Sequence, residues 1–461
     1  MRLSSFIGDR AFYRRLFAVV LPILAQNLIT NFVNLLDNVM VGQIGTEPMS
    51  GVAIVNQLFF VYNLCIFGGI AGAGIFTAQY YGSGDKKGVA DSVRAKLYIA
   101  LMTLTAFMAV FILLGDELIM LFIHEGSEGL DMAATLDYGR RYLAIMLWQM
   151  PPFALMQSYA GSLRETGETV LPMKAGIAAV LINLVGNYIL IFGKFGFPAL
   201  GVEGAAIATV ISRYVECAII LIWTHSHREK VPFAPGLYST WRIPLPLMKQ
   251  ILLLGMPLLV NEVLWAGGMT TLNQCYSMRG LEVVSAVNIS STVSNLFFCA
   301  FIAMGSATAI IVGQLLGAGE LERAVDEDIK LIAFSMAICV VIGAVLAALA
   351  PVIPRLYNTS DSVRHLATQL LMVVAVCMPM HSFTNSCYFT LRSGGKTLIT
   401  FVFDSLYLWV LCIPVAFVLS RFTMMPILTM YIIIQSLDII KCVIGFYLVK
   451  SKKWVKDLVN V

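Results

Sequence analysis

The chain has 461 residues, of which 59% are hydrophobic and only 13% are charged. Soluble domains carry about 25% charged residues, so this composition and a mean hydropathy of +0.82 exclude a water-soluble fold. The net charge of +4 is small for this length and indicates no nucleic-acid-binding surface.

Apolar runs bounded by charged residues, glycine or proline follow one another along the whole chain. A membrane-spanning helix needs about 20 apolar residues, and the runs are long enough for twelve such helices. They cover residues 14–40, 50–80, 93–114, 135–160, 170–193, 201–224, 247–275, 283–315, 329–350, 366–390, 397–420 and 426–449. The expected fold is therefore an all-α integral membrane protein with twelve transmembrane helices.

The segments between these helices differ in their content of basic residues. If the N terminus is cytoplasmic, the cytoplasmic segments hold 22 of the 31 Lys and Arg residues and the opposite side holds seven. The remaining two, Arg213 and Lys441, lie within predicted spans. Because cytoplasmic loops are enriched in Lys and Arg, both termini are expected to be cytoplasmic.

An internal repeat relates the two halves of the chain. Residues 22–84 align with residues 257–319 at a shift of 235 without a gap, with 12 identities in 63 pairs. Residues 150–169 align with residues 378–397 at a shift of 228, with seven identities in 20. Self-similarity at this scale indicates that each half is one structural repeat.

The repeat predicts the organisation of the chain. Six helices is an even number, so both halves enter the membrane in the same direction and form two pseudo-symmetric six-helix bundles. Parallel repeats around a shared cavity are typical of alternating-access transporters. We expect an N-terminal lobe at residues 1–225, a cytoplasmic linker at 226–246 and a C-terminal lobe at 247–461.

Ionisable side chains inside spans are costly and therefore mark candidate functional sites. Asp37 lies late in the first predicted helix, towards the outer face. Glu262 lies about twelve residues from the cytoplasmic end of the seventh helix, roughly 18 Å deep and near the middle of the membrane. His381 in the tenth helix can titrate near neutral pH. We expect Asp37, Glu262 and His381 to contact the substrate.

Neutral oxygen donors accompany Asp37 in the first half. Asn183 and Asn187 lie one turn apart on one face of the fifth predicted helix, and Thr209 lies on the sixth. Together with Asp37 they suit a Na⁺ ion, and they suit equally a protonatable acid in a hydrogen-bond network. Interhelical hydrogen bonding without any ion is the simpler alternative for the two asparagines.

Other signals point away from substrate contact or catalysis. Asp438 and Lys441 are three residues apart and are expected to neutralise each other across one helix turn. Residues 394–397 resemble the end of a phosphate-binding loop, but Thr390 stands in place of its first glycine and no strand precedes it, so ATP is not implied. The chain contains no HExxH motif and no paired aspartates on one helix, so no enzyme is expected.

Short motifs recur at equivalent places of the two halves. The halves open with LPILAQN at residues 21–27 and GMPLLVNE at 255–262. Both then carry Gln-x-x-Gly-x-Gly, at 79–84 and at 314–319, and GVEGAAIAT follows at 201–209. Over essentially the whole chain, these motifs resemble the multidrug and toxin extrusion (MATE) family.

The resemblance implies two six-helix bundles and export of small amphipathic, cationic compounds in exchange for Na⁺ or H⁺. It also implies a bacterial inner membrane protein, with membrane lipid but neither nucleic acid nor ATP as a partner, and no cofactor. By position, Asp37 is similar to the acid in helix 1 of the family. Glu262 is similar to the helix 7 acid of its NorM-like branch.

The resemblance also bears on the coupling ion. Asn183, Asn187 and Thr209 fall where the DinF-like branch builds a cation site, but Asn187 stands where that branch has a second Asp. His381 stands where the NorM-like branch has an Asp in helix 10. Both departures remove a negative charge and favour H⁺ over Na⁺, although Na⁺ at Asp37, Asn183 and Asn187 stays open.

A flippase for lipid-linked saccharides, on a similar bundle, is the alternative function. Such a protein is expected to line its cavity with several Arg or Lys side chains. Only Arg213 and Lys441 lie well inside a predicted span rather than near its ends, which favours export of cations.

Overall fold

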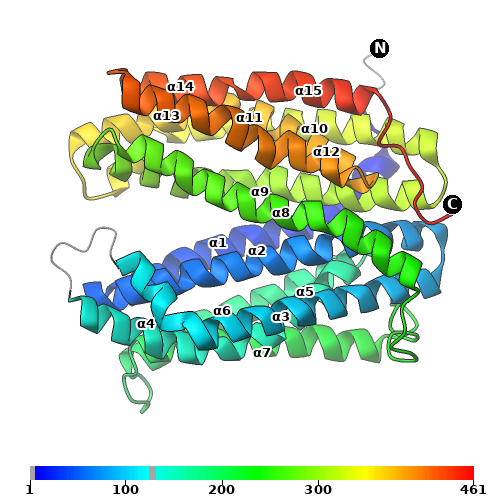
Figure 1. Cartoon of the computed structure of the whole chain (residues 1–461), viewed down its shortest axis with the longest axis horizontal. Coiled ribbons are helices and arrows are strands. Elements are labelled where there is room, and N and C mark those ends of the chain that lie inside the picture. Colours follow the sequence, from blue (N-terminus) through cyan, green and yellow to red (C-terminus); the bar gives the residue numbers. More distant parts are fainter. Residues whose placement is uncertain (1–5, 124–130, 461) are drawn as a thin grey trace. The chain divides into compact units, whose positions relative to one another are not determined.

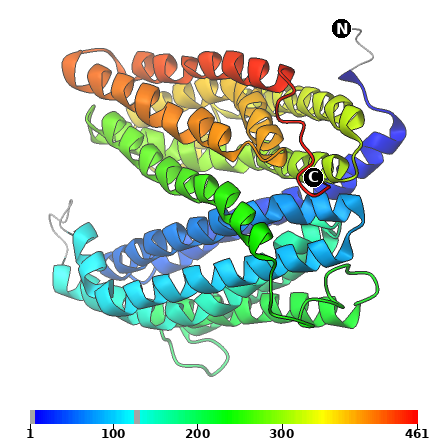
Figure 2. The same cartoon turned by 45° about the vertical axis from the view of Figure 1, so that its right-hand side comes forward.

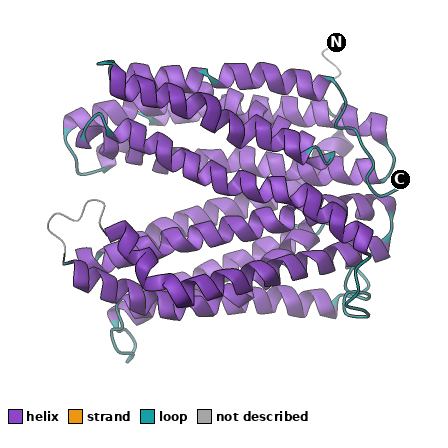
Figure 3. Cartoon of the chain, in the orientation of Figure 1, coloured by secondary structure: helices purple, strands orange, loops and turns teal. Residues whose placement is uncertain are grey.

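The computed structural model describes residues 6–123 and 131–460. Within these residues every regular element is a helix (Figure 3). In chain order (Figure 1) they are α1 (Arg10–Gly42), α2 (Thr46–Ser83), α3 (Lys86–Ile123), α4 (Met132–Met146), α5 (Met150–Glu165), α6 (Val170–Phe192), α7 (Val202–Ser226), α8 (Leu245–Ser277), α9 (Leu281–Gly317), α10 (Leu321–Leu349), α11 (Asp361–Ser393), α12 (Thr397–Phe401), α13 (Ile413–Phe422), α14 (Ile427–Ser436) and α15 (Asp438–Lys450). Eleven helical segments of the described chain are long and apolar enough to cross a membrane, so the prediction of an all-α membrane protein is confirmed.

Three of the twelve predicted spans are interrupted, and the last of them breaks at Leu437 between α14 and α15. A 3-10 helix at Leu147–Gln149 separates α4 from α5, and π-helical turns at Val402–Leu406 and Leu408–Cys412 separate α12 from α13. Pro151 and Pro414 lie in the first turns of α5 and α13. A proline there sacrifices no helical hydrogen bond, so the sequence marks the places where these helices restart.

The chain divides into two compact units. We call residues 25–77 and 86–255 the N-terminal unit, and residues 1–24, 78–85 and 256–461 the C-terminal unit. The lobe boundaries expected from the repeat stay a prediction.

Within the N-terminal unit, the segment expected as a linker is packed against the helices. Arg94 on α3 donates its Nε to the carbonyl oxygen of Leu237 at 2.8 Å. Phe233 and Leu237 are fully buried. Apolar side chains in a polar-looking connection therefore anchor this segment.

Within the C-terminal unit, α11 is the central helix. It packs against α9, α10, α12, α14 and α15. Trp454, in the tail after α15, is buried in an apolar cluster with Ala324 and Leu331 of α10 and Leu391 of α11. The tail is thus part of the core of this unit rather than an appendage.

The end of α2 crosses α9 at the two Gln-x-x-Gly motifs, inside the C-terminal unit. A Cβ atom on Gly82 would lie 1.9 Å from the carbonyl oxygen of Gln314, and one on Gly317 would lie 1.9 Å from that of Gln79. The crossing is reciprocal because Gly82 and Gly317, like Gln79 and Gln314, are equivalent in the repeat. Only glycine allows two backbones to approach this closely.

The C-terminal tail runs to the same crossing (Figure 2). The amide of Leu458 donates to Oε1 of Gln79 at 2.8 Å, and Nε2 of Gln79 donates to the carbonyl oxygen of Lys456 at 3.3 Å. Asn460 donates its Nδ2 to the carbonyl oxygen of Gly317 at 3.0 Å. Gln79 is fully buried, so the tail satisfies polar atoms that would otherwise be costly to bury.

Candidate functional site

The four residues predicted as a cation-coupling group meet in the N-terminal unit, where α1, α6 and α7 come together. Asn187 donates its Nδ2 to Oδ1 of Asp37 at 2.7 Å. In the orientation of the Asn183 amide that suits Asp37 and Thr209, its nitrogen donates to Oδ2 of Asp37 at 2.8 Å and its oxygen accepts from the Thr209 hydroxyl at 3.0 Å. The Asp37 carboxylate thus accepts hydrogen bonds from two amides of α6, and one of these amides, Asn183, is itself hydrogen-bonded to Thr209 of α7.

Helix spacing and a small residue explain this geometry. Asn183 and Asn187 are four residues apart on α6, so both side chains lie on one face of the helix. Gly186 lies between them, and a Cβ atom there would come 2.9 Å from the Cβ of Ala208 on α7. Small residues let transmembrane helices approach closely, which brings the hydroxyl of Thr209 within reach of α6.

The polar atoms around Asp37 can serve two charge states. Oδ1 of Asn187 is buried and has no hydrogen-bond partner. An amide carries both donors and an acceptor, so the Asn187 side chain can donate to an ionised carboxylate or, turned over, accept from a protonated one. The arrangement therefore suits a group that gains and loses a proton.

The basic residue predicted within a span of the first half is paired elsewhere. Arg213 donates its Nη1 to Oε2 of Glu216 at 2.8 Å, although its charge also acts on Asp37 through space. In the part of the chain that the structure describes, no ion pair involves Asp37. Asp37 is thus a carboxylate held by neutral donors.

Glu262 lies on α8 in the C-terminal unit, next to a hydrogen-bonded amide. Asn261 donates its Nδ2 to Oδ2 of Asp404 at 3.1 Å, and its Oδ1 accepts from the hydroxyl of Ser405 at 2.7 Å. Lys441 pairs with Oδ1 of Asp404 at 2.8 Å. Asp404 is therefore neutralised, whereas no ion pair involves Glu262 within residues 6–123 and 131–460.

His381 and Asp438 form a pair between α11 and α15. Nδ1 of His381 lies 3.0 Å from Oδ2 of Asp438. Asp438 and Lys441 act on each other through space, but each has a different ion-pair partner. These partners are His381 on α11 for Asp438 and Asp404, in the π-helical turn Val402–Leu406, for Lys441. Spacing along one helix does not reveal which neighbouring helix brings the counter-charge.

The predicted substrate-contacting residues are divided between the units. Glu262 and His381 belong to the C-terminal unit and Asp37 to the N-terminal unit. No hydrogen bond or ion pair joins Glu262 to His381 among the residues that are described. Their role in substrate binding stays a prediction.

Sequence reasoning missed several buried charges at helix ends. Lys96 on α3 is almost fully buried; it pairs with Glu165 and donates its Nζ to the hydroxyl of Ser162 at 3.0 Å. Asp328 near the start of α10 is fully buried. Both lie in charged segments that are typical of solvated loops, so only the packing reveals that they are inside the protein.

The chain matches known proteins over nearly its whole length. The family model MatE matches residues 22–189 and 257–418. The relatives include "Probable multidrug resistance protein NorM" of Thermotoga maritima, 25% identical over 97% of this chain and 94% of that protein. Another is "Multidrug resistance protein NorM" of Photobacterium profundum, 24% identical over 88% of this chain and 87% of that protein.

Solved structures with the same fold include "Crystal structure of MATE in complex with MaL6", with a TM-score of 0.85, 19% identity and 98% of each chain covered. A mutant of the Vibrio cholerae MATE transporter VcmN has a TM-score of 0.81 and 18% identity, over 96% of this chain and 98% of that one. At these identities the structures show the fold alone. The family model spans both halves of the chain, and the protein therefore belongs to the MatE family of membrane transporters.

Proposed function

We propose that this protein exports small amphipathic cations and is driven by exchange with protons rather than by ATP. Two relatives are named as multidrug resistance proteins, and family membership supports the same role here. The observation that carries the proposal is the position of Asp37, whose carboxylate is held by two amides and has no ion-pair partner in the described part of the chain. Ionisable groups in such settings mark ion pathways.

Proton exchange follows from what Asp37 can do in this setting. Exchange requires that ion and substrate bias the same conformational equilibrium. Protonation removes the negative charge of Asp37 and turns the carboxylate from an acceptor into a donor. Asn187 must then accept a hydrogen bond instead of donating one, and its unpartnered Oδ1 can accept the new O–H. Loading and unloading a single proton therefore changes both charge and local contacts.

Na⁺ fits the same residues less well. A Na⁺ ion binds oxygen atoms, whereas the Asp37 carboxylate faces amide nitrogens, 2.7 Å away on Asn187 and 2.8 Å away on Asn183. Both amides would have to turn over, and the site would hold one formal negative charge. These features favour H⁺ over Na⁺ as the exchanged ion.

Export itself is tested in cells that lack their own exporters. Expression of the protein should lower the accumulation of a fluorescent organic cation, because the proposed activity moves it out of the cytoplasm. Unchanged accumulation of several chemically different cations, with the protein present in the membrane, would contradict the proposal.

Glu262 is proposed to bind the positive charge of the substrate. In the described chain Glu262 has no ion-pair partner, whereas the neighbouring carboxylate of Asp404 is paired with Lys441. Glu262→Gln is expected to raise the KM for cationic substrates about 10-fold, which corresponds to about 1.4 kcal/mol, and to change the KM for neutral substrates less.

The control for this variant is Glu282→Gln. Glu282 lies at the start of α9 in the same unit, where it is exposed and accepts from Ser362 at 2.8 Å, so its replacement should leave both KM values unchanged. Efflux rates over a range of substrate concentrations give the KM values of both variants and of the wild type. If Glu262→Gln raises the KM of cationic and neutral substrates equally, Glu262 has a structural role.

We place the protein in a bacterial inner membrane with both termini in the cytoplasm. The excess of basic residues in alternate segments supports this orientation. A reporter enzyme that works only in the cytoplasm should therefore be active when it is fused after Val461.

A further inference from the structure

A fully buried carboxylate that is not among the predicted site residues lies in the C-terminal unit. Asp328 on α10 is 0% exposed. The hydroxyl of Thr390 on α11 donates to its Oδ1 at 2.6 Å, whereas its Oδ2 has no hydrogen-bond partner. The hydroxyl of Ser386, one turn before Thr390, is also fully buried and has no partner.

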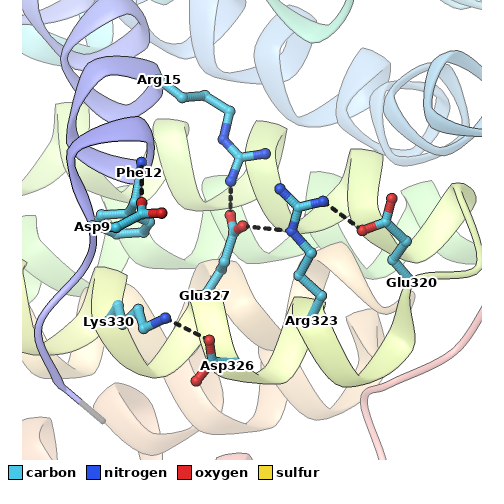
Figure 4. Close-up of polar contacts among 8 residues, drawn as sticks. All are labelled: Asp9, Phe12, Arg15, Glu320, Arg323, Asp326, Glu327 and Lys330. Carbon is cyan, nitrogen blue, oxygen red and sulfur yellow. Dashed lines mark hydrogen bonds and ion pairs between the residues drawn. The ribbon is translucent and has the colours of Figure 1, made fainter. Parts of the chain in front are cut away.

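The basic side chains near the start of α10 are all committed to other carboxylates (Figure 4). The pairs are Arg15–Glu327, Arg323–Glu327 at 3.0 Å, Arg323–Glu320 at 2.7 Å and Lys330–Asp326 at 2.5 Å. Each of these carboxylates precedes Asp328 in the chain, and Glu327 is its direct neighbour. Asp328 is therefore left without a cation from α1 or from its own helix.

The facing helix α11 supplies no counter-charge either. Arg392 lies two residues after Thr390, but its guanidinium lies 5.5 Å from the centre of the Phe389 ring and its charge acts on Glu262. The charge of Asp328 acts on Cys387 of α11, and a thiol adds no positive charge. In the described parts of the chain no ion pair involves Asp328.

An unpaired buried charge costs several kcal/mol, and a carboxylate in this position is expected to bind a proton instead. The neutral acid needs fewer partners than the ionised form. One hydrogen bond from Thr390 is compatible with it, and Oδ2 can then carry the proton.

The site lies close to an end of its helices but is covered. Asp328 is seven residues from the start of α10, or about 10 Å along the helix axis. Thr390 is three residues before the end of α11, where the carbonyl oxygen of Ser393 accepts from Gln79 at 3.0 Å. Trp454 of the tail belongs to the same buried apolar cluster as Leu331 of α10 and Leu391 of α11. Asp328 is 0% exposed, so water reaches it only if the segments that cover it move.

We propose that Asp328 is a second proton-binding site, which exchanges its proton with water when this cover opens during transport. The carboxyl group of Asp328 gives its proton to a water molecule, and the Thr390 hydroxyl then stabilises the resulting carboxylate by donating a hydrogen bond to it. This inference rests on the proposed exchange with protons, and it adds a group in the C-terminal unit to Asp37 in the N-terminal unit.

The first test asks whether Asp328 carries a proton in the resting protein. Infrared spectra of the purified full-length protein in lipid nanodiscs at neutral pH are compared for the wild type and Asp328→Asn. The variant should lose a band from the C=O stretch of a protonated carboxyl group. The loss of an ionised carboxylate band, or of no carboxyl band, would overturn the proposal.

The second test asks whether the proton is exchanged. Asp328→Asn keeps the neutral, hydrogen-bonding shape, so its thermal stability should match the wild type while efflux driven by a proton gradient falls at least 10-fold. Substrate exchange without a gradient should persist. Efflux at the wild-type rate would show that Asp328 is a permanently neutral structural group and would overturn the exchange.

Three further variants serve as controls for these tests. Asp326→Asn alters an exposed acid on the same helix that pairs with Lys330 and should leave efflux unchanged. Thr390→Val removes the donor to Asp328 and should impair proton-driven efflux, whereas Thr390→Ser should restore it. If efflux proves to follow Na⁺, the proposed function fails, but the infrared comparison still decides whether Asp328 binds a proton.

Discussion

Asp37→Asn is expected to reduce substrate efflux to the level of membranes without the protein, while the protein still inserts and folds. Asparagine keeps the size of the side chain and can still accept a hydrogen bond from Asn187, which donates at 2.7 Å in the wild type. It cannot bind or release a proton, so the ion step of the exchange is lost. Accumulation of a fluorescent cation inside everted vesicles, into which an exporter moves its substrate, measures the effect.

A conservative change outside the site serves as the control for this variant. Asp116 on α3 is partly exposed and pairs with Arg140 at 2.6 Å, so Asp116→Asn should retain efflux. Thr209→Val should cause a smaller loss than Asp37→Asn, because Thr209 contacts Asn183 rather than the carboxylate. Wild-type efflux by Asp37→Asn would remove Asp37 from the coupling mechanism.

Gly317→Ala is expected to destabilise the C-terminal unit strongly. The new Cβ would lie 1.9 Å from the carbonyl oxygen of Gln79 and 2.5 Å from its Cα. Because these are backbone atoms, they cannot move aside as a flexible side chain would. Overpacking of this kind costs about 1–3 kcal/mol, and it should lower the melting temperature in detergent and reduce the yield of monodisperse protein.

Gly267→Ala is the matched control for this prediction. Gly267 lies inside α8, where the nearest atom to a new Cβ is 3.7 Å away, on Trp409. Alanine is favoured over glycine inside a helix by about 1 kcal/mol, so this variant should be as stable as the wild type or more stable. Equal melting temperatures for both variants would show that α2 and α9 do not cross as closely as described.

The cluster around Asp37 shows what could be predicted from the sequence. Helical periodicity puts Asn183 and Asn187 on one face of α6, and the apolar runs place α6 and α7 in succession, so their meeting with Thr209 followed directly. The orientation of the amides did not follow. Whether nitrogen or oxygen faces Asp37 depends on the hydrogen bonds of all three helices together, which spacing along the chain does not contain.

Asp328 shows where sequence reasoning failed and why. The stretch from Glu320 to Lys330 contains seven charged residues in eleven, and such a stretch is typical of a solvated loop end. Six of the seven are exposed or take part in ion pairs, whereas Asp328 faces α11 and is buried. The face of α10 that meets α11 is a tertiary property, and a predicted helix that begins at residue 329 hides it.

The segment expected as a linker and the C-terminal tail also contain buried residues that the sequence did not predict. Phe233, Leu237 and Trp454 are apolar residues within polar segments outside the predicted spans, and all three are buried. Their partners come from helices far away in the chain. A single apolar residue in a polar segment carries no periodicity, so its burial could not be predicted.

The central claim is that the protein exchanges its substrate for protons through Asp37. The most direct measurement is substrate efflux in everted vesicles at equal pH on both sides, with the proton gradient collapsed by an ionophore and a Na⁺ gradient imposed. We expect efflux to stop under these conditions and to return when a pH difference is imposed without Na⁺. Efflux that follows the Na⁺ gradient at an undiminished rate would contradict the claim.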